Sequence, residues 1–291
     1  MVLRSIPDYT IPSGRRQSLF GTGLPSGAPR GPKAARSTRA LGRVDPCRIR
    51  AAVIVLQYAA GAIGRSAGAR GAMFGEREGR WPKWIERQLV RRGIRDERVL
   101  EAFARVPREA FVPRRFRLLA YEDGPLRIGC GQTISQPYVV ALSLEAMALR
   151  GAEKVLDVGT GSGYQAALLS YLAREVYTIE VYLKLFTRAR LTIEAHHQSP
   201  VYSRHGDGSL GWPEAAPFDA IVVGARAPKL PESLLAQLAV GGRLVIPIGG
   251  ESAQVLCQIV KEPGGGARKR VLERVMYVPL VGEEGTGRLP E

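Results

Sequence analysis

From residue 81 onward, short continuous apolar runs alternate along the chain with segments whose apolar residues recur every three or four positions. A continuous apolar run of about four to eight residues predicts a buried strand, and the wider spacing predicts an amphipathic helix. Alternation of the two predicts a mostly parallel sheet with helices on both of its faces. The predicted strands span residues 154–158, 175–181, 201–204 and 218–224, and the predicted helices span residues 164–173, 183–196 and 232–238.

The two ends of this region depart from the alternation. Before it, helical spacing predicts a helix over residues 82–92, a second one after the capping residue Asp96, and a third over residues 136–149. After it, three strand-like runs follow without helices between them, so the sheet should end in antiparallel strands. The fold class is therefore α/β, a doubly wound, mostly parallel, Rossmann-like sheet with antiparallel C-terminal strands and an N-terminal helical cap. The three runs span residues 242–248, 253–261 and 270–280, and the glycine-containing stretch 126–135 is predicted to be a loop.

Residues 1–80 have a different composition. They are rich in Arg, Gly, Pro and Ser, and they hold 14 Lys and Arg against 4 Asp and Glu, whereas residues 81–291 hold 28 against 23. The overall charge of +15 therefore belongs mainly to this first segment. Such a segment cannot bury enough apolar surface to offset its ordering entropy. We expect a basic, low-complexity, disordered extension over residues 1–80 and a single catalytic domain over residues 81–291.

Composition also excludes several classes of protein. The chain is 45% hydrophobic, yet it has no apolar run of 18 residues, so a membrane-spanning helix is not expected. Its three cysteines form no CxxC pair, which argues against a disulfide framework and a zinc ribbon. The neighbouring residues His196 and His197 cannot share a helix face, so no metal site is predicted. This cysteine usage is typical of a reducing compartment, and we expect a cytoplasmic protein that does not contact membranes.

The candidate chemistry centres on the stretch Val155-Leu-Asp-Val-Gly-Thr-Gly-Ser-Gly-Tyr164. Here a glycine loop follows a predicted strand and opens a helix, where doubly wound sheets bind nucleotides. Tyr164 stands where the dinucleotide pattern needs a third glycine, and the loop has no lysine for a phosphate-binding motif. Asp157 would repel a pyrophosphate but attract a cationic ligand such as S-adenosyl-L-methionine. The predicted cofactor-binding loop comprises Gly159, Thr160, Gly161, Ser162 and Gly163.

Two further acidic positions follow the next two strands. Glu180 lies 17 residues after Gly163, near the spacing at which a carboxylate accepts hydrogen bonds from ribose hydroxyls. Asp207 and Gly208 come after the third strand, where Asp207 could accept a hydrogen bond from an adenine amino group. Both positions join the predicted cofactor site.

Five further stretches stand out: Val106-Pro-Arg-Glu-Ala-Phe-Val112, Gly131-Gln-Thr-Ile-Ser-Gln-Pro-Tyr138, His205-Gly-Asp-Gly208, Ala216-Pro-Phe-Asp-Ala-Ile221 and Gly241-Gly-Arg-Leu-Val-Ile-Pro-Ile-Gly249. Together they resemble the protein-L-isoaspartate O-methyltransferase family, over about residues 84–281. The resemblance implies that Ser135 is the active-site serine and that Gln132, Thr133 and Ile134 border the sulfonium side of the cofactor. It also implies the same cofactor contacts for Asp157, the glycine loop, Glu180 and Asp207-Gly208. Arg226 stands where the family usually has a small residue.

The function implied is methyl transfer from S-adenosyl-L-methionine to the α-carboxyl of L-isoaspartyl residues in damaged peptides and proteins, by a monomer that does not bind nucleic acid. Two alternatives stay open. One is another S-adenosylmethionine-dependent methyltransferase, such as one that methylates nucleic-acid bases. Such enzymes usually have an acidic or amide residue followed by prolines and an aromatic residue after the fourth strand, whereas this chain has Gly224-Ala-Arg-Ala-Pro there. The other is a nucleic-acid-binding protein that acts through its basic N-terminal segment, whose binding would weaken with salt.

Overall fold

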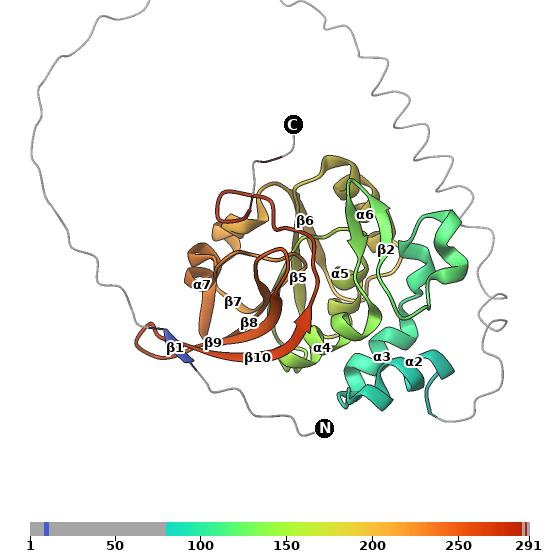
Figure 1. Cartoon of the computed structure of the whole chain (residues 1–291), viewed down its shortest axis with the longest axis horizontal. Coiled ribbons are helices and arrows are strands. Elements are labelled where there is room, and N and C mark those ends of the chain that lie inside the picture. The colour runs from blue at the N-terminus through green and yellow to red at the C-terminus, as the bar shows by residue number, and fades with distance from the viewer. Residues whose placement is uncertain (1–8, 12–79, 287–288, 290–291) are drawn as a thin grey trace, which may run out of the picture. The chain divides into compact units, whose positions relative to one another are not determined.

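One eight-stranded sheet organises the part of the chain that the computed structural model describes, residues 9–11, 80–286 and 289 (Figure 1). Its strand order is β1-β10-β9-β8-β7-β4-β5-β6. The strands β4 to β8 run parallel, and β9 and β10 continue the sheet in antiparallel fashion, as the sequence predicted. The bounds are β4 Lys154–Val158, β5 Glu175–Glu180, β6 Val201–His205, β7 Phe218–Val223, β8 Leu238–Gly249, β9 Gln254–Lys261 and β10 Ala267–Val275.

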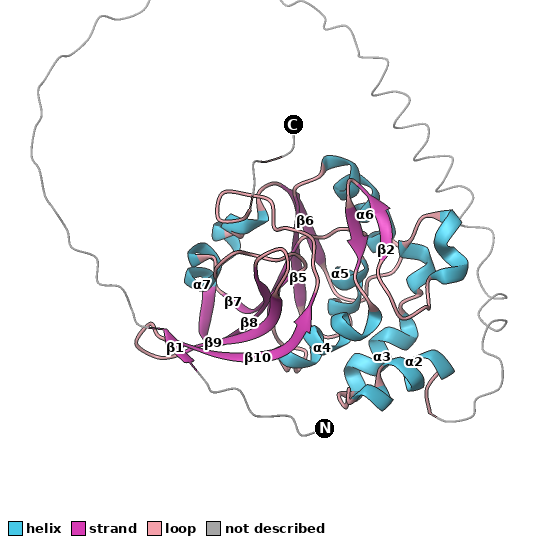
Figure 2. Ribbon diagram, viewed as in Figure 1, coloured by secondary structure: helices cyan, strands magenta, loops and turns pink. Residues whose placement is uncertain are grey.

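Helices cover both faces of this sheet (Figure 2). Side chains of a strand point alternately to its two faces, and β4 shows the consequence. Val155 packs into one buried cluster with α4, α5 and α6, whereas Leu156 and Val158 pack into another with α7. The bounds of these helices are α4 Pro137–Met147, α5 Tyr164–Leu169, α6 Leu183–Glu194 and α7 Glu232–Gln237.

The N-terminal cap packs against the first of these clusters. It contains α2 (Lys83–Gln88) and α3 (Glu97–Arg105), followed by the short 3-10 helices η2 (Arg108–Phe111) and η3 (Arg114–Leu119). The Asp96 side chain accepts hydrogen bonds from the first turn of α3, as the sequence predicted. The apolar face of α3 is buried, so the cap is fixed to the domain by hydrophobic packing.

The bounds of several predicted elements were wrong. The helix predicted over residues 82–92 ends at Gln88, and the strand predicted to begin at residue 242 begins at Leu238. The stretch 126–135 is a hairpin of β2 (Leu126–Gly129) and β3 (Gln132–Ile134), because Cys130 and Gly131 both adopt positive φ and form a tight turn. Helix α5 stops at Leu169, where the hydroxyl of Ser170 donates to the carbonyl of Ala167. Strand β10 ends at Val275, because the amide of Tyr277 donates to the side chain of Gln254 instead of continuing the ladder.

The predicted extension lies outside the described residues, except for its strand β1 (Tyr9–Ile11) and Arg80. Strand β1 pairs antiparallel with the edge strand β10, a pairing that the sequence did not predict. Within the described part of the chain, no helix has the length and apolar character that crossing a membrane requires.

Candidate active site

The strand order reverses its direction at β4, which has β5 on one side and β7 on the other. Crevices at such a switch point, at the carboxyl ends of the strands, are where open α/β sheets bind ligands. The loop from Gly159 to Gly163 lies at this end, and the amides of Gly159 and Thr160 donate to the carbonyl of Ile179 at the end of β5. The loop is thereby held against the neighbouring strand.

Gly163 shows why this loop needs glycine. Its φ is +89°, and a Cβ atom there would lie 2.8 Å from Cγ1 of Ile193 in helix α6. Any side chain would therefore strain the backbone and push α5 away from α6. The two hydroxyls of the loop, those of Thr160 and Ser162, both interact with other protein groups. Thr160 Oγ1 lies 2.6 Å from Thr178 Oγ1, and Ser162 Oγ accepts a hydrogen bond from the amide of Tyr164.

Glu180 ties the glycine loop to the end of β5. Its carboxylate accepts one hydrogen bond from the amide of Gly161, at 2.7 Å, and one from the amide of Tyr182, at 2.9 Å. Burial raises the pKa of Glu180, and these backbone amides act in the opposite direction. Each carboxylate oxygen keeps a further lone pair for a ligand hydroxyl. The structure thus places Glu180 at the end of β5, where it shapes the glycine loop, and its binding of ribose hydroxyls stays a prediction.

Asp157 lies at the end of β4, where the sequence places it before the glycine loop, and its side chain is buried. Its side chain is fully enclosed, with one carboxylate oxygen accepting from Gln165 and the other from Thr178, each at 2.8 Å. Burial raises its pKa to about 6, against the effect of those two hydrogen bonds. The carboxylate therefore does not line open space. It can act on a cation only through its electric field, which a low-dielectric surrounding weakens little.

Asp207 and Gly208 complete the row of strand ends after β6. Gly208 packs so closely on Val158 that a Cβ atom would lie 2.8 Å from that side chain. The Asp207 carboxylate accepts from the amide and hydroxyl of Ser209, and also from the amide of Glu283. The last contact joins residues far apart in the sequence and was not predicted. The C-terminal segment 282–284 therefore closes over the turn after β6.

Gly282 is where this closure depends on glycine, because a Cβ atom there would lie 2.0 Å from Oδ1 of Asp207. A Gly282→Ala variant should lose the hydrogen bonds of Glu283 and Glu284 with the turn. Its free energy of unfolding should therefore be about 2 kcal/mol lower than that of wild type, as measured by urea unfolding. Gly250→Ala is the control, since a Cβ atom at Gly250 meets nothing within 4 Å. Equal unfolding midpoints for the two variants would contradict this prediction.

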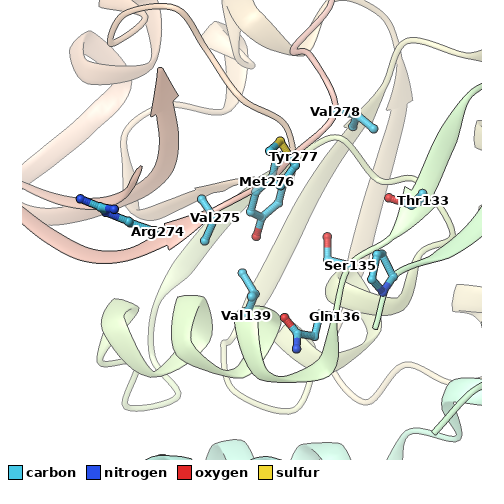
Figure 3. Close-up of a pocket in the computed structure, with 11 residues that line it drawn as sticks. Thr133, Ser135, Gln136, Val139, Arg274, Val275, Met276, Tyr277 and Val278 are labelled. Carbon is cyan, nitrogen blue, oxygen red and sulfur yellow. The ribbon is translucent and has the colours of Figure 1, made fainter. Parts of the chain in front are cut away.

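Ser135 lines an open pocket of about 380 Å³ beside the glycine loop (Figure 3). The pocket also touches Gly224, whose amide donates to the carbonyl of Val158 immediately before the loop. The volume lies within the range of small-ligand sites, about 300–1,000 Å³. The lining comes from the end of the β2–β3 hairpin, the start of α4 and the segment after β10, namely Pro125, Thr133, Ser135, Gln136, Val139, Gly224, Arg274, Val275, Met276, Tyr277 and Val278.

Tyr277 is the residue of this pocket that the sequence did not reveal. Its hydroxyl and that of Ser135 both point into the pocket from opposite elements (Figure 3). Burial raises the pKa of Tyr277 to about 12, while hydrogen bonding with the Ser143 and Ser135 hydroxyls acts to lower it. The phenol therefore stays protonated at neutral pH and adds a second neutral hydrogen-bond donor next to Ser135.

The hairpin residues Gln132 and Ile134 and the departure Arg226 lie in different surroundings. Gln132 lies with its amide nitrogen 3.5 Å from the hydroxyl of Tyr182, just after Glu180. Ile134 is 4% exposed and packs in the core, so only its backbone is available to a ligand. Arg226 does not line the Ser135 pocket, because its buried guanidinium turns towards the carbonyl of Gly249.

Most of the described part of the chain is similar in sequence to known proteins. The family described as protein-L-isoaspartate(D-aspartate) O-methyltransferase matches residues 83–285. A protein-L-isoaspartate O-methyltransferase 2 from Marinobacter nauticus is 55% identical over 200 residues, which cover 68% of this chain and 91% of that protein. One from Rhodopseudomonas palustris is 51% identical over 204 residues, covering 70% and 83% of the two chains.

A solved structure has a similar fold. A Plasmodium falciparum chain described as a protein-L-isoaspartate O-methyltransferase, crystallised with S-adenosyl-L-homocysteine, is 31% identical, with a TM-score of 0.58 over 68% of this chain and 96% of that one. The family match covers nearly all of the domain that holds the glycine loop and the Ser135 pocket. The chain belongs to the protein-L-isoaspartate(D-aspartate) O-methyltransferase family.

Proposed function

We propose that this protein transfers a methyl group from S-adenosyl-L-methionine to the α-carboxyl of L-isoaspartyl residues in peptides and proteins. The observation that carries the proposal is the adjacency of two sites at one edge of the sheet, within a chain of this family. The glycine loop and the Ser135 pocket meet at Gly224, which lines the pocket and bonds to the strand before the loop. A donor and an acceptor could therefore lie side by side.

The residues at the strand ends fit S-adenosylmethionine. The glycine loop allows close backbone approach, and Glu180 offers lone pairs to ribose hydroxyls. The backbone of Asp207 and Gly208 would border the adenine, since the Asp207 carboxylate is already engaged by Ser209 and Glu283. The buried charge of Asp157 favours a cationic ligand over a pyrophosphate. When bound, the cofactor supplies an electrophilic methyl group on a positively charged sulfur.

The acceptor fits the two neutral hydroxyls, those of Ser135 and Tyr277, in a pocket whose one charged lining residue is Arg274. An isoaspartyl residue has a free α-carboxylate, which is ionised at pH 7 and needs no general base. Catalysis then rests mainly on proximity and alignment. The hydroxyls of Ser135 and Tyr277 can donate to one carboxylate oxygen and orient it, while the other oxygen stays free to attack. Neutral donors orient the nucleophile without quenching its charge, as a direct arginine contact would.

The ester formed in this way starts repair. The backbone nitrogen of the following residue attacks the ester carbonyl, methanol leaves, and a succinimide forms. Water then opens the ring without the enzyme, partly to normal aspartate. We also propose that the enzyme acts in the cytoplasm as a monomer, on proteins rather than nucleic acid, since residues 81–291 have only a small charge excess.

The direct test offers labelled S-adenosylmethionine with an isoaspartyl peptide and with its aspartyl twin. We expect label only in the isoaspartyl peptide, and a Ser135→Ala variant should lower kcat/KM about 10–100-fold through loss of a hydrogen bond to a charged group. Ser199→Ala is the control, because the Ser199 hydroxyl has no hydrogen-bond partner among the described residues. Ser199 also precedes the amino end of β6, whereas the proposed site lies at the carboxyl ends of the strands. Equal labelling of both peptides, or of neither, would contradict the function.

A further inference from the structure

Arg108 is a buried cation beside the proposed active site. It belongs to the Val106–Val112 stretch, to which the function above gives no task, and its side chain is 0% exposed. Its Nε donates to the carbonyl of Ala120 at 2.8 Å, and its Nη2 donates to the carbonyl of Ser135 at 2.7 Å. The cap is thus bonded directly to the peptide group of the proposed active-site serine.

The same guanidinium reaches the donor side of the site. Its central carbon lies 5.1 Å from the ring centre of Tyr164, the residue that follows the glycine loop and begins α5. Such a cation over an aromatic face is attractive. Arg108 therefore contacts both the Ser135 peptide and the helix that opens at Gly163. Among the described residues, no other side chain hydrogen-bonds to the Ser135 carbonyl.

This placement is costly for the stability of the protein. No carboxylate within the described ranges forms an ion pair with Arg108, and its Nη1 has no hydrogen-bond partner there. The neighbouring carboxylate of Glu109 bonds instead to the hydroxyl of Tyr121. Burying a charged group without an opposite charge lowers the stability of the folded protein. An apolar side chain of similar size often gives equal or greater stability. The arginine is therefore better explained by what it positions.

We infer that Arg108 is a positioning residue for methyl transfer, which holds the Ser135 peptide at a fixed place relative to the start of α5. The inference rests on the proposed function. Because alignment dominates this reaction, a shift of about 1 Å in the Ser135 hydroxyl is expected to cost about 100-fold in rate. Among the described residues, Arg108 forms no hydrogen bond with the glycine loop or with Glu180, so we expect little change in cofactor affinity when it is replaced.

Arg98 provides a matched control. It also donates two hydrogen bonds to backbone carbonyls, those of Leu149 at 2.7 Å and Leu172 at 3.0 Å, but it lies away from the Ser135 pocket. Both arginines join the helical cap to the domain. Arg108→Met and Arg98→Met should therefore lose similar numbers of hydrogen bonds, while only the first changes the surroundings of Ser135.

The test measures kcat with an isoaspartyl peptide and S-adenosylhomocysteine affinity by calorimetry. We expect Arg108→Met to lower kcat about 10–100-fold with the dissociation constant within about threefold of wild type, Arg108→Lys to lie between, and Arg98→Met to keep the wild-type kcat. Equal kcat in the two methionine variants would overturn the inference. If Arg108→Met does not fold, wild-type kcat in Arg108→Lys overturns it instead. A wild-type enzyme that does not methylate the peptide would refute the proposed function, which is a separate outcome.

Discussion

A Glu180→Leu variant should bind S-adenosylhomocysteine about 100-fold more weakly than the wild type, as measured by calorimetry. The Glu180 carboxylate holds the Gly161 amide of the glycine loop and the Tyr182 amide after β5. A hydrogen bond to a charged group contributes about 1.5–3 kcal/mol, and leucine removes both bonds together with the acceptor for ribose hydroxyls. The loop would then lose its attachment to β5 at the point where the ligand binds.

Two further variants sharpen this result. Glu180→Gln should fall between wild type and Glu180→Leu, because an amide oxygen can still accept one of the two backbone hydrogen bonds. Glu175→Leu changes the first residue of the same strand, at the amino end of β5, and Glu180 lies at its carboxyl end. Glu175 forms an ion pair with Arg174 there. Its ligand affinity should match the wild type. If Glu175→Leu weakened binding as much as Glu180→Leu, the placement of the ligand at the carboxyl end of β5 would be wrong.

The second large effect concerns Asp157 and pH. Its pKa is about 6 in the folded protein, above the ordinary value of 3.8, because its carboxylate is enclosed. Between these values the folded protein binds more protons than the unfolded chain, so the contribution of Asp157 to the free energy of unfolding falls as the pH rises. The loss is nearly complete one pH unit above the folded pKa and amounts to about 3 kcal/mol at most.

The measurement compares wild type with Asp157→Asn by urea unfolding at several pH values between 4 and 8. Other carboxyl groups titrate in both proteins and cancel in the difference. We expect the free energy of unfolding of Asp157→Asn to rise relative to that of wild type as the pH rises from 4 to about 7, and the difference to stay nearly constant above that. A difference that does not change with pH would show that the folded protein does not raise the pKa of Asp157.

This cost is relevant to function, because an enclosed carboxylate is an unusual residue to keep in a core. Its hydrogen bonds from Thr178 and Gln165 hold it directly below the glycine loop. A negative charge in that position discriminates in favour of a cationic ligand. The stability lost in the folded protein is therefore consistent with a site for a positively charged donor.

The features that could be predicted from the sequence are local ones. Strand β4 has the predicted bounds, and Asp96 caps α3, because apolar runs and capping residues act within a few positions. The glycine loop opens α5 for the same reason. The hairpin at 126–134 was missed, although the pair Cys130-Gly131 is a turn signal, since its strands are short and surrounded by other glycines.

The features that could not be predicted depend on contacts between distant parts of the chain. Tyr277 faces Ser135 only because the segment after β10 leaves the sheet and crosses the carboxyl edge. Glu283 reaches Asp207, and Arg108 reaches Ser135, across long stretches of sequence. The enclosure of Asp157 likewise follows from the packing of Thr178 and Gln165 over it. No periodicity or motif specifies such pairings.

A crystal structure of the protein with S-adenosylhomocysteine would test the central claim, that donor and acceptor sites share the carboxyl edge of β4 to β7. We predict that the ligand lies across the glycine loop, with its ribose at Glu180, its adenine at Asp207 and Gly208, and its sulfur facing the Ser135 pocket. A ligand bound elsewhere, or with its sulfur directed away from Ser135, would contradict the account.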